Sequence, residues 1–161
     1  MKAIETLHNN ILFRSRLEAR WAIYFETMGF DYLYEYEGFD LNSAGWYLPD
    51  FYLPHVQMWG EVKPETFTDT ELEKLKALVI FTQKPALMLI GTPEQKPYDA
   101  WCFDKWSKPN GIYTCDFVLS NYHNYYQKEK RFYGATGDGL APDDMFDDIA
   151  IGILAAKSAR F

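Results

Sequence analysis

The stretch from residue 46 to residue 63 constrains the fold most, because it contains two strand-like runs on either side of a short turn. Trp46–Leu53 is rich in aromatic residues, which favour strands, and a Pro-His pair closes it. Gln57–Lys63 is the second run of this pair. Pro49 interrupts Trp46–Leu53, which predicts an edge position or a bulge where no backbone donor is required. We expect the two runs to be adjacent strands of an antiparallel meander.

The segments around this pair predict a mixed α/β domain. Phe13–Met28 has apolar residues at helical spacing, and Asp31–Glu37 alternates like a strand. Thr68–Phe81 predicts a second helix with an apolar face, and Pro85–Ile90 predicts a buried strand. The expected order is therefore a helix, three antiparallel strands, a helix and a strand, with a right-handed parallel crossover around the second helix.

The C-terminal third of the sequence is less regular. Tyr98–Phe103 and Ile112–Leu119 are candidate strands, whereas Tyr122–Phe132 and Pro142–Ala159 are candidate helices. The glycine-rich Gly134–Asp138 is expected to be a loop, because it lacks the Lys-Ser/Thr of a phosphate-binding P-loop. We predict one domain over residues 1–161, with a core at about 12–90 and a helical C-terminal extension at 91–161, around a mixed central sheet.

Composition restricts the class of protein. Apolar residues make up 48% of the 161 residues, which favours a packed globule over a disordered chain. The formal net charge is −7, which argues against an extended nucleic-acid-binding surface because phosphate contacts need Lys and Arg. A local basic patch can still bind DNA, and a carboxylate metal site itself contributes negative charge.

The cysteine pattern and the hydropathy bear on the cellular compartment. Cys102 and Cys115 form no CxxC pair and have no histidine at zinc-finger spacing, so we expect two reduced thiols. No stretch reaches the ~18 consecutive apolar residues of a membrane span. The N-terminus also lacks the pattern of a signal peptide. The chain is therefore expected to be soluble and cytoplasmic.

Charged residues of the strand pair form the candidate active site. Asp50 lies on one run and Glu61 on the next, while Glu61 and Lys63 are two residues apart and so point to the same face. Two converging carboxylates suit Mg²⁺, which Mn²⁺ can replace, and the carbonyl of Val62 could add a ligand. The metal would polarise a phosphodiester and activate water, and the lysine would orient that water or stabilise the developing charge.

The spacing of these residues resembles the signature of the PD-(D/E)xK nuclease superfamily. The residues that match this signature are Pro49-Asp50 and Glu61-Val62-Lys63, and the similarity covers roughly residues 12–90. The superfamily includes restriction endonucleases, phage exonucleases and Holliday junction resolvases, and its core has the same order of helices and strands. Members often carry an acidic residue on the first helix, and Glu18 occupies that place. The Arg-Ser-x-x-Glu-Ala pattern around Glu18 is similar to that of small phage-encoded members.

The resemblance implies a restriction-endonuclease-like core and a Mg²⁺-dependent endonuclease that hydrolyses DNA. It implies that Asp50 and Glu61 bind the metal, that Glu18 binds or orients it through water, and that Lys63 assists the attacking water. Branched DNA such as a Holliday junction is the first candidate substrate, which would place the protein in DNA recombination. Junction resolvases of this superfamily act as homodimers, so a homodimer is expected.

Two basic clusters are candidates for DNA contacts. Arg14, Arg16 and Arg20 surround the first helix and could hold phosphates, although a solvated helix face is an equal alternative. Lys128, Lys130 and Arg131 follow several tyrosines, and an ordinary amphipathic helix is the favoured interpretation there. Two other functions stay open, namely a nuclease for single strands or RNA and a non-catalytic domain that binds nucleic acid or protein.

Overall fold

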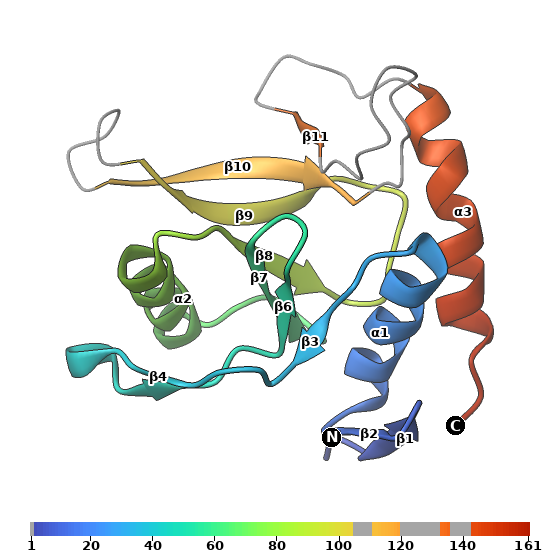
Figure 1. The fold of residues 1–161 in the computed structure, drawn as a ribbon, viewed down its shortest axis with the longest axis horizontal. Helices are drawn as coiled ribbons and strands as arrows, with labels where there is room; N and C mark the ends of the chain where they lie inside the picture. The colour runs from blue at the N-terminus through green and yellow to red at the C-terminus, as the bar shows by residue number, and fades with distance from the viewer. Residues whose placement is uncertain (1, 105–110, 120–132, 136–142) are drawn as a thin grey trace.

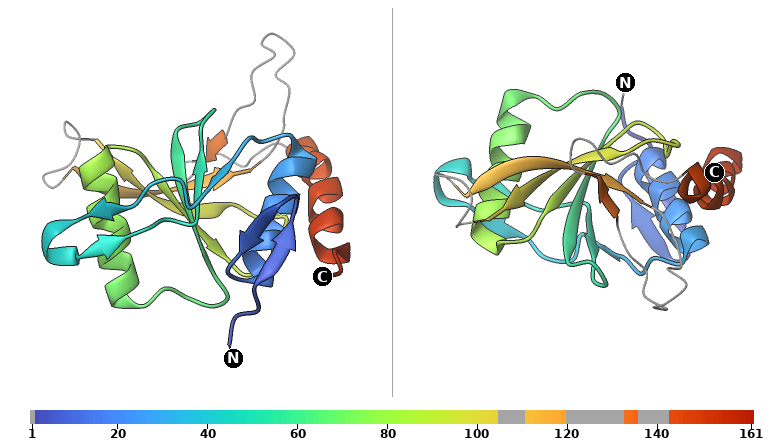
Figure 2. Two further views of the ribbon diagram at one scale, coloured as in Figure 1. Left: turned by 60° about the horizontal axis from the view of Figure 1, so that its bottom comes forward. Right: turned by 90° about the horizontal axis from the view of Figure 1, so that it is seen from above.

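The computed structural model describes residues 2–104, 111–119, 133–135 and 143–161. These residues form a mixed α/β fold in which three α-helices flank a seven-stranded mixed sheet (Figure 1). Helix α1 (Arg16–Met28) packs against α3 (Asp143–Ser158), and α2 (Asp69–Thr82) lies away from both (Figure 1, Figure 2). The α/β class and the mixed sheet were both predicted from the sequence.

The central sheet combines strands from most of the described chain. Its order is β11-β10-β9-β8-β7-β6-β3. The strands are β3 (Leu33–Tyr34), β6 (Phe51–Leu53), β7 (Met58–Lys63), β8 (Ala86–Ile90), β9 (Tyr98–Phe103), β10 (Ile112–Val118) and β11 (Tyr133–Ala135). Strands β7 and β8 pair in parallel, and the other described neighbours pair antiparallel. The predicted meander of three strands followed by a helix and a parallel strand is therefore confirmed.

The start of the first helix differs from the prediction. The helix begins at Arg16, because the side chain of Ser15 accepts a hydrogen bond from the Glu18 N–H and caps it. Phe13 instead belongs to an unpredicted hairpin of β1 (Thr6–His8) and β2 (Ile11–Phe13). Its turn is Asn9-Asn10, with φ angles of 47° and 64°, a backbone conformation that asparagine tolerates.

The predicted strand over residues 46–53 is broken in two at Pro49. Strand β5 (Trp46–Tyr47) pairs with β4 (Phe39–Asp40) in a separate ribbon that a short 3₁₀-helix, η1 (Asn42–Ala44), connects. Strand β6 joins the central sheet. Proline cannot donate a ladder hydrogen bond, so the chain changes partner at this point. Asp50 follows Pro49 directly and precedes the first residue of β6.

Two hydrophobic clusters lie on opposite faces of the sheet. The larger one contains Trp21, Tyr24 and Phe25 of α1 together with residues of β6, β8 and α3. The smaller one contains Leu75 and Leu78 of α2, packed against other residues of β7 and β8. Because strand side chains alternate between faces, strands such as β7 and β8 contribute residues to both clusters. The sheet is thus covered by helices on both sides, as in a layered α/β domain.

The close approach of α3 to α1 depends on a glycine. A Cβ atom built on Gly152 would lie 2.8 Å from Cγ of Met28 and 2.9 Å from Cδ2 of Tyr24. Only a residue without a side chain fits there without displacing a neighbour. The two helices consequently pack with little space between them.

The C-terminal part corrects three expectations. It is not simply a helical extension, because β9 and β10 continue the central sheet. Gly134 and Ala135 lie in β11 and not in a loop. A disulfide joins Cys102 of β9 to Cys115 of β10, with Cα atoms 6.9 Å apart, so the prediction of two reduced thiols is wrong. Residues 122–132 and Pro142 lie outside the described residues. No helix in the described segments is long and apolar enough to cross a bilayer.

Candidate active site

The candidate site lies where strands β6 and β7 separate. Their pairing ends at Phe51 opposite Gly60, whereas β7 continues along β8 as far as Lys63. The N–H of Val62 therefore lacks a strand partner on the β6 side and donates to Oδ2 of Asp50 at 2.8 Å. Because a buried backbone N–H needs an acceptor, this bond fixes the Asp50 carboxylate against β7. The sheet itself brings Asp50 next to Glu61.

Glu61 and Lys63 lie on one face of β7, as the sequence spacing predicted. Nζ of Lys63 is 3.0 Å from Oε1 of Glu61 and also 3.0 Å from Oε1 of Glu71. Val62 lies between them and packs into the cluster on the α1 side. Burial alone would lower the pKa of Lys63, but the two carboxylates raise it overall. Lys63 is therefore a positioned ammonium group at neutral pH.

Glu71 holds the other side of Lys63 because of its place in α2. Thr68 and Glu71 form a capping box, in which each side chain bonds the backbone N–H of the other. The Glu71 carboxylate is also in contact with Lys63. The start of α2 is thereby connected to the candidate site.

Glu18 is buried at the first turn of α1. Its carboxylate accepts hydrogen bonds from the Ser15 hydroxyl at 2.7 Å, from the Tyr34 hydroxyl at 2.5 Å and from the Arg14 N–H at 3.2 Å. Burial and the bond to Glu18 raise the pKa of Tyr34, so the phenol keeps its proton and remains a donor. These three donors hold Glu18 in a fixed orientation at the edge of the site.

The site concentrates negative charge in a buried place. Asp50 is 4% exposed and Glu61 is 6% exposed. Burial, followed by the charges of Glu61 and Glu18, raises the pKa of Asp50 well above its ordinary value. Oε2 of Glu61 is buried and has no hydrogen-bond partner among the described residues. Lys63 contacts only Oε1, and a second buried oxygen without a donor is costly, so the arrangement fits a hard divalent metal.

The direct ligand set is small in the described part of the chain. No three acidic, histidine or cysteine side chains there come close enough to hold one metal ion together. Asp50 and Glu61 are consequently the side chains that fit direct metal contact, with Glu18 farther away in its own hydrogen-bond network. Val62 contributes its N–H to Asp50, and the role predicted for its carbonyl stays a prediction.

Among the three predicted arginines, only Arg14 forms an ion pair with a carboxylate of the candidate site. Its Nη2 is 3.1 Å from Oδ1 of Asp50, and its Nε is 2.5 Å from Oε1 of Glu35. The sequence placed Arg14 near Glu18, but only its backbone N–H bonds that residue. Arg14 therefore neutralises part of the charge on Asp50.

Arg20 and Arg16 have different surroundings. The guanidinium of Arg20 donates to the carbonyls of Ala156 and Lys157 at the end of α3 and lies over the Phe161 ring. These bonds satisfy carbonyls that a helix end leaves free, so Arg20 has a structural role. Arg16 is exposed, and no hydrogen bond or ion pair is seen for it within the described segments.

Four residues at the site were missed from the sequence, namely Tyr34, Glu35, Tyr47 and Glu71. The Thr-x-x-Glu pattern of a capping box could have drawn attention to Glu71. Burial, the nearby charge of Glu61 and a hydrogen bond with the Glu61 side chain raise the pKa of Tyr47, which places this tyrosine beside the carboxylates. The two tyrosines and Glu35 carry no sequence signal, because their contacts depend on how the strands are arranged.

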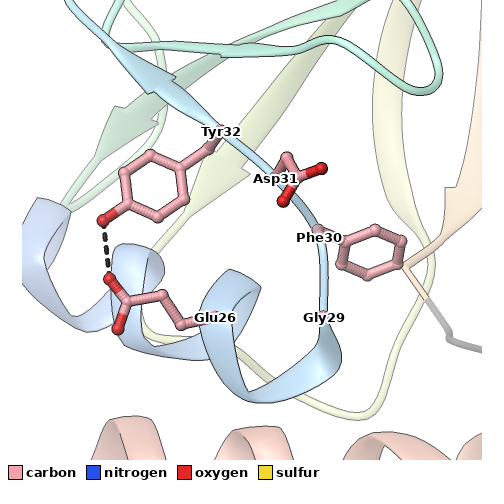
Figure 3. A pocket seen from close by; sticks show the side chains of 5 residues that line it. All are labelled: Glu26, Gly29, Phe30, Asp31 and Tyr32. Atoms are coloured by element: carbon pink, nitrogen blue, oxygen red, sulfur yellow. Dashed lines mark hydrogen bonds between the residues drawn. The ribbon is translucent and has the colours of Figure 1, made fainter.

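A separate surface pocket of about 430 Å³ lies at the other end of α1, lined by Glu26, Gly29, Phe30, Asp31 and Tyr32 (Figure 3). Its acidic groups already have partners. Glu26 bonds His8, Asn9 and Tyr32, and Asp31 pairs with His55. The pocket contains none of the residues of the candidate site, and its chemistry suggests no reaction.

The second basic cluster, Lys128, Lys130 and Arg131, lies outside the described residues. No protein-family model, no curated protein and no solved structure matches this chain.

Proposed function

We propose that this protein is a metal-dependent endonuclease that hydrolyses phosphodiester bonds in DNA, on a restriction-endonuclease-like core of the PD-(D/E)xK type. The observation that carries the proposal is the buried, unpartnered Oε2 of Glu61 beside the desolvated Asp50. Two such carboxylates next to a fixed ammonium group have no evident use in a structural core. They would supply metal ligands and a positive charge for phosphodiester hydrolysis with a divalent metal.

Each side chain has a role that follows from its position. Asp50 and Glu61 would hold Mg²⁺ or Mn²⁺, with the Val62 carbonyl as a further ligand and Glu18 acting through water. When bound, the cation would supply the charge that polarises the phosphodiester and a water molecule. Lys63, kept protonated by Glu61 and Glu71, would orient that water and stabilise the negative charge that develops on the phosphate.

Branched DNA, such as a four-way junction, is the first substrate we propose, and a homodimer is the assembly. Both follow from the resemblance to small phage-encoded nucleases and junction resolvases, whose two subunits cut two strands symmetrically. A cytoplasmic location would agree with this substrate.

Cleavage of a labelled panel tests the proposal. The panel contains duplex, single-stranded DNA, a flap, a four-way junction and RNA, each with Mg²⁺ or Mn²⁺. Lys63→Ala and Glu61→Gln should each reduce the cleavage rate by about 10²–10³-fold, as loss of one charge-stabilising group does. Lys96→Ala and Glu73→Gln are matched controls, because each changes a residue of an exposed ion pair that includes no residue of the site.

The pattern of cleavage separates the alternatives. Preference for the single strand or for RNA would replace branched DNA as the substrate. If no panel member is cut in either metal, or if the two site variants cut as fast as the wild type, the nuclease proposal is wrong. Binding without cleavage would then indicate a non-catalytic domain.

A further inference from the structure

Arg14 contacts the oxygen of Asp50 that carries no backbone hydrogen bond among the described residues. Oδ2 of Asp50 accepts a hydrogen bond from the Val62 N–H, whereas no backbone donor is seen on Oδ1 among the described residues. That oxygen is 3.1 Å from Nη2 of Arg14. A guanidinium and a divalent cation repel each other in a site of low dielectric, so each weakens the binding of the other to this carboxylate. Binding of the cation therefore favours the departure of Arg14 from Asp50.

The structure also contains a second partner for Arg14. Its Nε is 2.5 Å from Oε1 of Glu35, whose side chain is more exposed than that of Asp50. The Glu35 N–H donates to the Asp50 carbonyl at 2.9 Å, so the two acidic residues are held at neighbouring positions. The Arg14 side chain is 56% exposed and can turn toward solvent without disturbing the core. It can leave Asp50 and remain beside the site.

We propose that Arg14 is a displaceable counter-ion, which neutralises Asp50 until a divalent cation binds and then uses its freed guanidinium to bind a DNA phosphate. This inference rests on the proposed metal-dependent nuclease function. Arginine suits the second role because its planar fork matches two phosphate oxygens. Binding of the cation and binding of DNA are then coupled, since each favours the state in which Arg14 has left Asp50.

Metal affinity without DNA tests the first step. Calorimetric titration with Mn²⁺ compares the wild type with Arg14→Ala, Arg16→Ala and Glu61→Gln. Removing Arg14 should tighten Mn²⁺ binding about 5-fold or more, the lower end of usual coupling factors. Arg16→Ala removes an equal charge from a residue that has no ion pair in the described segments, so it should change the affinity less than about 2-fold. Glu61→Gln should weaken Mn²⁺ binding strongly.

DNA affinity tests the second step. Junction binding is measured with Ca²⁺, which prefers the same oxygen ligands, and again with a chelator, while the recovered DNA is checked to be intact. Arg14→Ala should weaken binding about 5-fold or more with Ca²⁺ and less than about 2-fold with the chelator. In a plot of log affinity against log salt concentration, the slope for Arg14→Ala should be shallower than that for wild type by about one. We expect this difference only when Ca²⁺ is present. Arg14→Gln repeats both tests if the alanine variant does not fold.

The outcomes distinguish the inference from the function on which it rests. If Glu61→Gln abolishes Mn²⁺ binding but Arg14→Ala binds Mn²⁺ no tighter than wild type, the counter-ion role is wrong and the nuclease proposal stands. If Arg14→Ala loses the same DNA affinity with Ca²⁺ as with chelator, the coupling is wrong and the nuclease proposal again stands. If Mn²⁺ binds neither wild type nor Arg14→Ala, or binds Glu61→Gln as well as wild type, the metal site itself is wrong and both proposals fail.

Discussion

At the scale of single residues, the buried charges of the candidate site lower the stability of the fold. Asp50 and Glu61 are both buried, and the charge of Glu61 is one cause of the raised pKa of Asp50. Lys63 and Arg14 each contact only one of the two carboxylates. Without a cation, the remaining repulsion lowers the free energy of unfolding. Functional sites commonly carry such a cost.

The variant Glu61→Gln should therefore be more stable than the wild type when divalent ions are removed. The amide keeps the shape of the side chain and an oxygen for Lys63, but it removes one buried charge. We expect a gain of about 0.5–2 kcal/mol in the free energy of unfolding, measured with urea in the presence of a chelator. Excess Mg²⁺ should raise the stability of the wild type but not that of the variant. A variant less stable than wild type with chelator would contradict this account.

Residue types and spacing were sufficient to predict Asp50, Glu61 and Lys63 as candidates, and the resemblance to a nuclease superfamily added Glu18. The spacing of two along a strand already determined that Glu61 and Lys63 share a face. The partner of Arg14 was not predictable, because its contact with Asp50 joins residues that are 36 positions apart. Such a contact depends on the separation of β6 from β7, which no local pattern describes.

At the scale of elements, one pair of neighbouring strands places two acidic residues opposite each other. Asp99 of β9 lies opposite Asp116 of β10. A shared hydrogen bond with Asp116, then burial and the charge of Asp116, raise the pKa of Asp99 above its ordinary value. Directly opposed like charges destabilise an antiparallel pair. The pair is well removed in sequence from the candidate site.

Stability should depend on pH through this pair. Because the folded state raises the pKa of Asp99, it holds a proton there that the unfolded chain has already lost, so the free energy of unfolding decreases as pH rises from about 4. At pH 7, Asp116→Asn should be more stable than the wild type by about 0.2–1 kcal/mol. The difference should vanish toward pH 4, whereas Glu65→Gln, an exposed control, should show no such trend. A difference that is the same at both pH values would exclude the pair as its cause.

The elements themselves were predicted well where periodicity was strong. Both helices of the first half and the parallel step across α2 follow from apolar spacing and from the predicted order. The break at Pro49 was predicted only as a bulge or edge, because the sequence does not show which strand each half will join. The Asn9-Asn10 hairpin was missed, since its two strands are only three residues each.

At the scale of the whole molecule, the contact of α1 with α3 joins the two ends of the described chain. Gly152 should be essential to it, because a larger residue would push against Met28 and Tyr24. We expect Gly152→Val to lower the free energy of unfolding by about 1–3 kcal/mol, the usual cost of overpacking. Ala150→Val adds the same kind of side chain at an exposed position of the same helix and is the matched control. Thermal melting of the two variants measures the difference, and equal melting temperatures would contradict the tight packing.

The distance along the chain between these two helices has a consequence for folding. The Arg20–Ala156 bond spans 136 residues, whereas the residues of the candidate site all lie between Arg14 and Glu71. Long-range contacts form late, because the entropy of closing a long loop must first be overcome. The charges of the site can thus assemble while the apolar face of α1 with Tyr24 and Met28 is still uncovered. During synthesis this face would be open to aggregation and to chaperones until α3 is made.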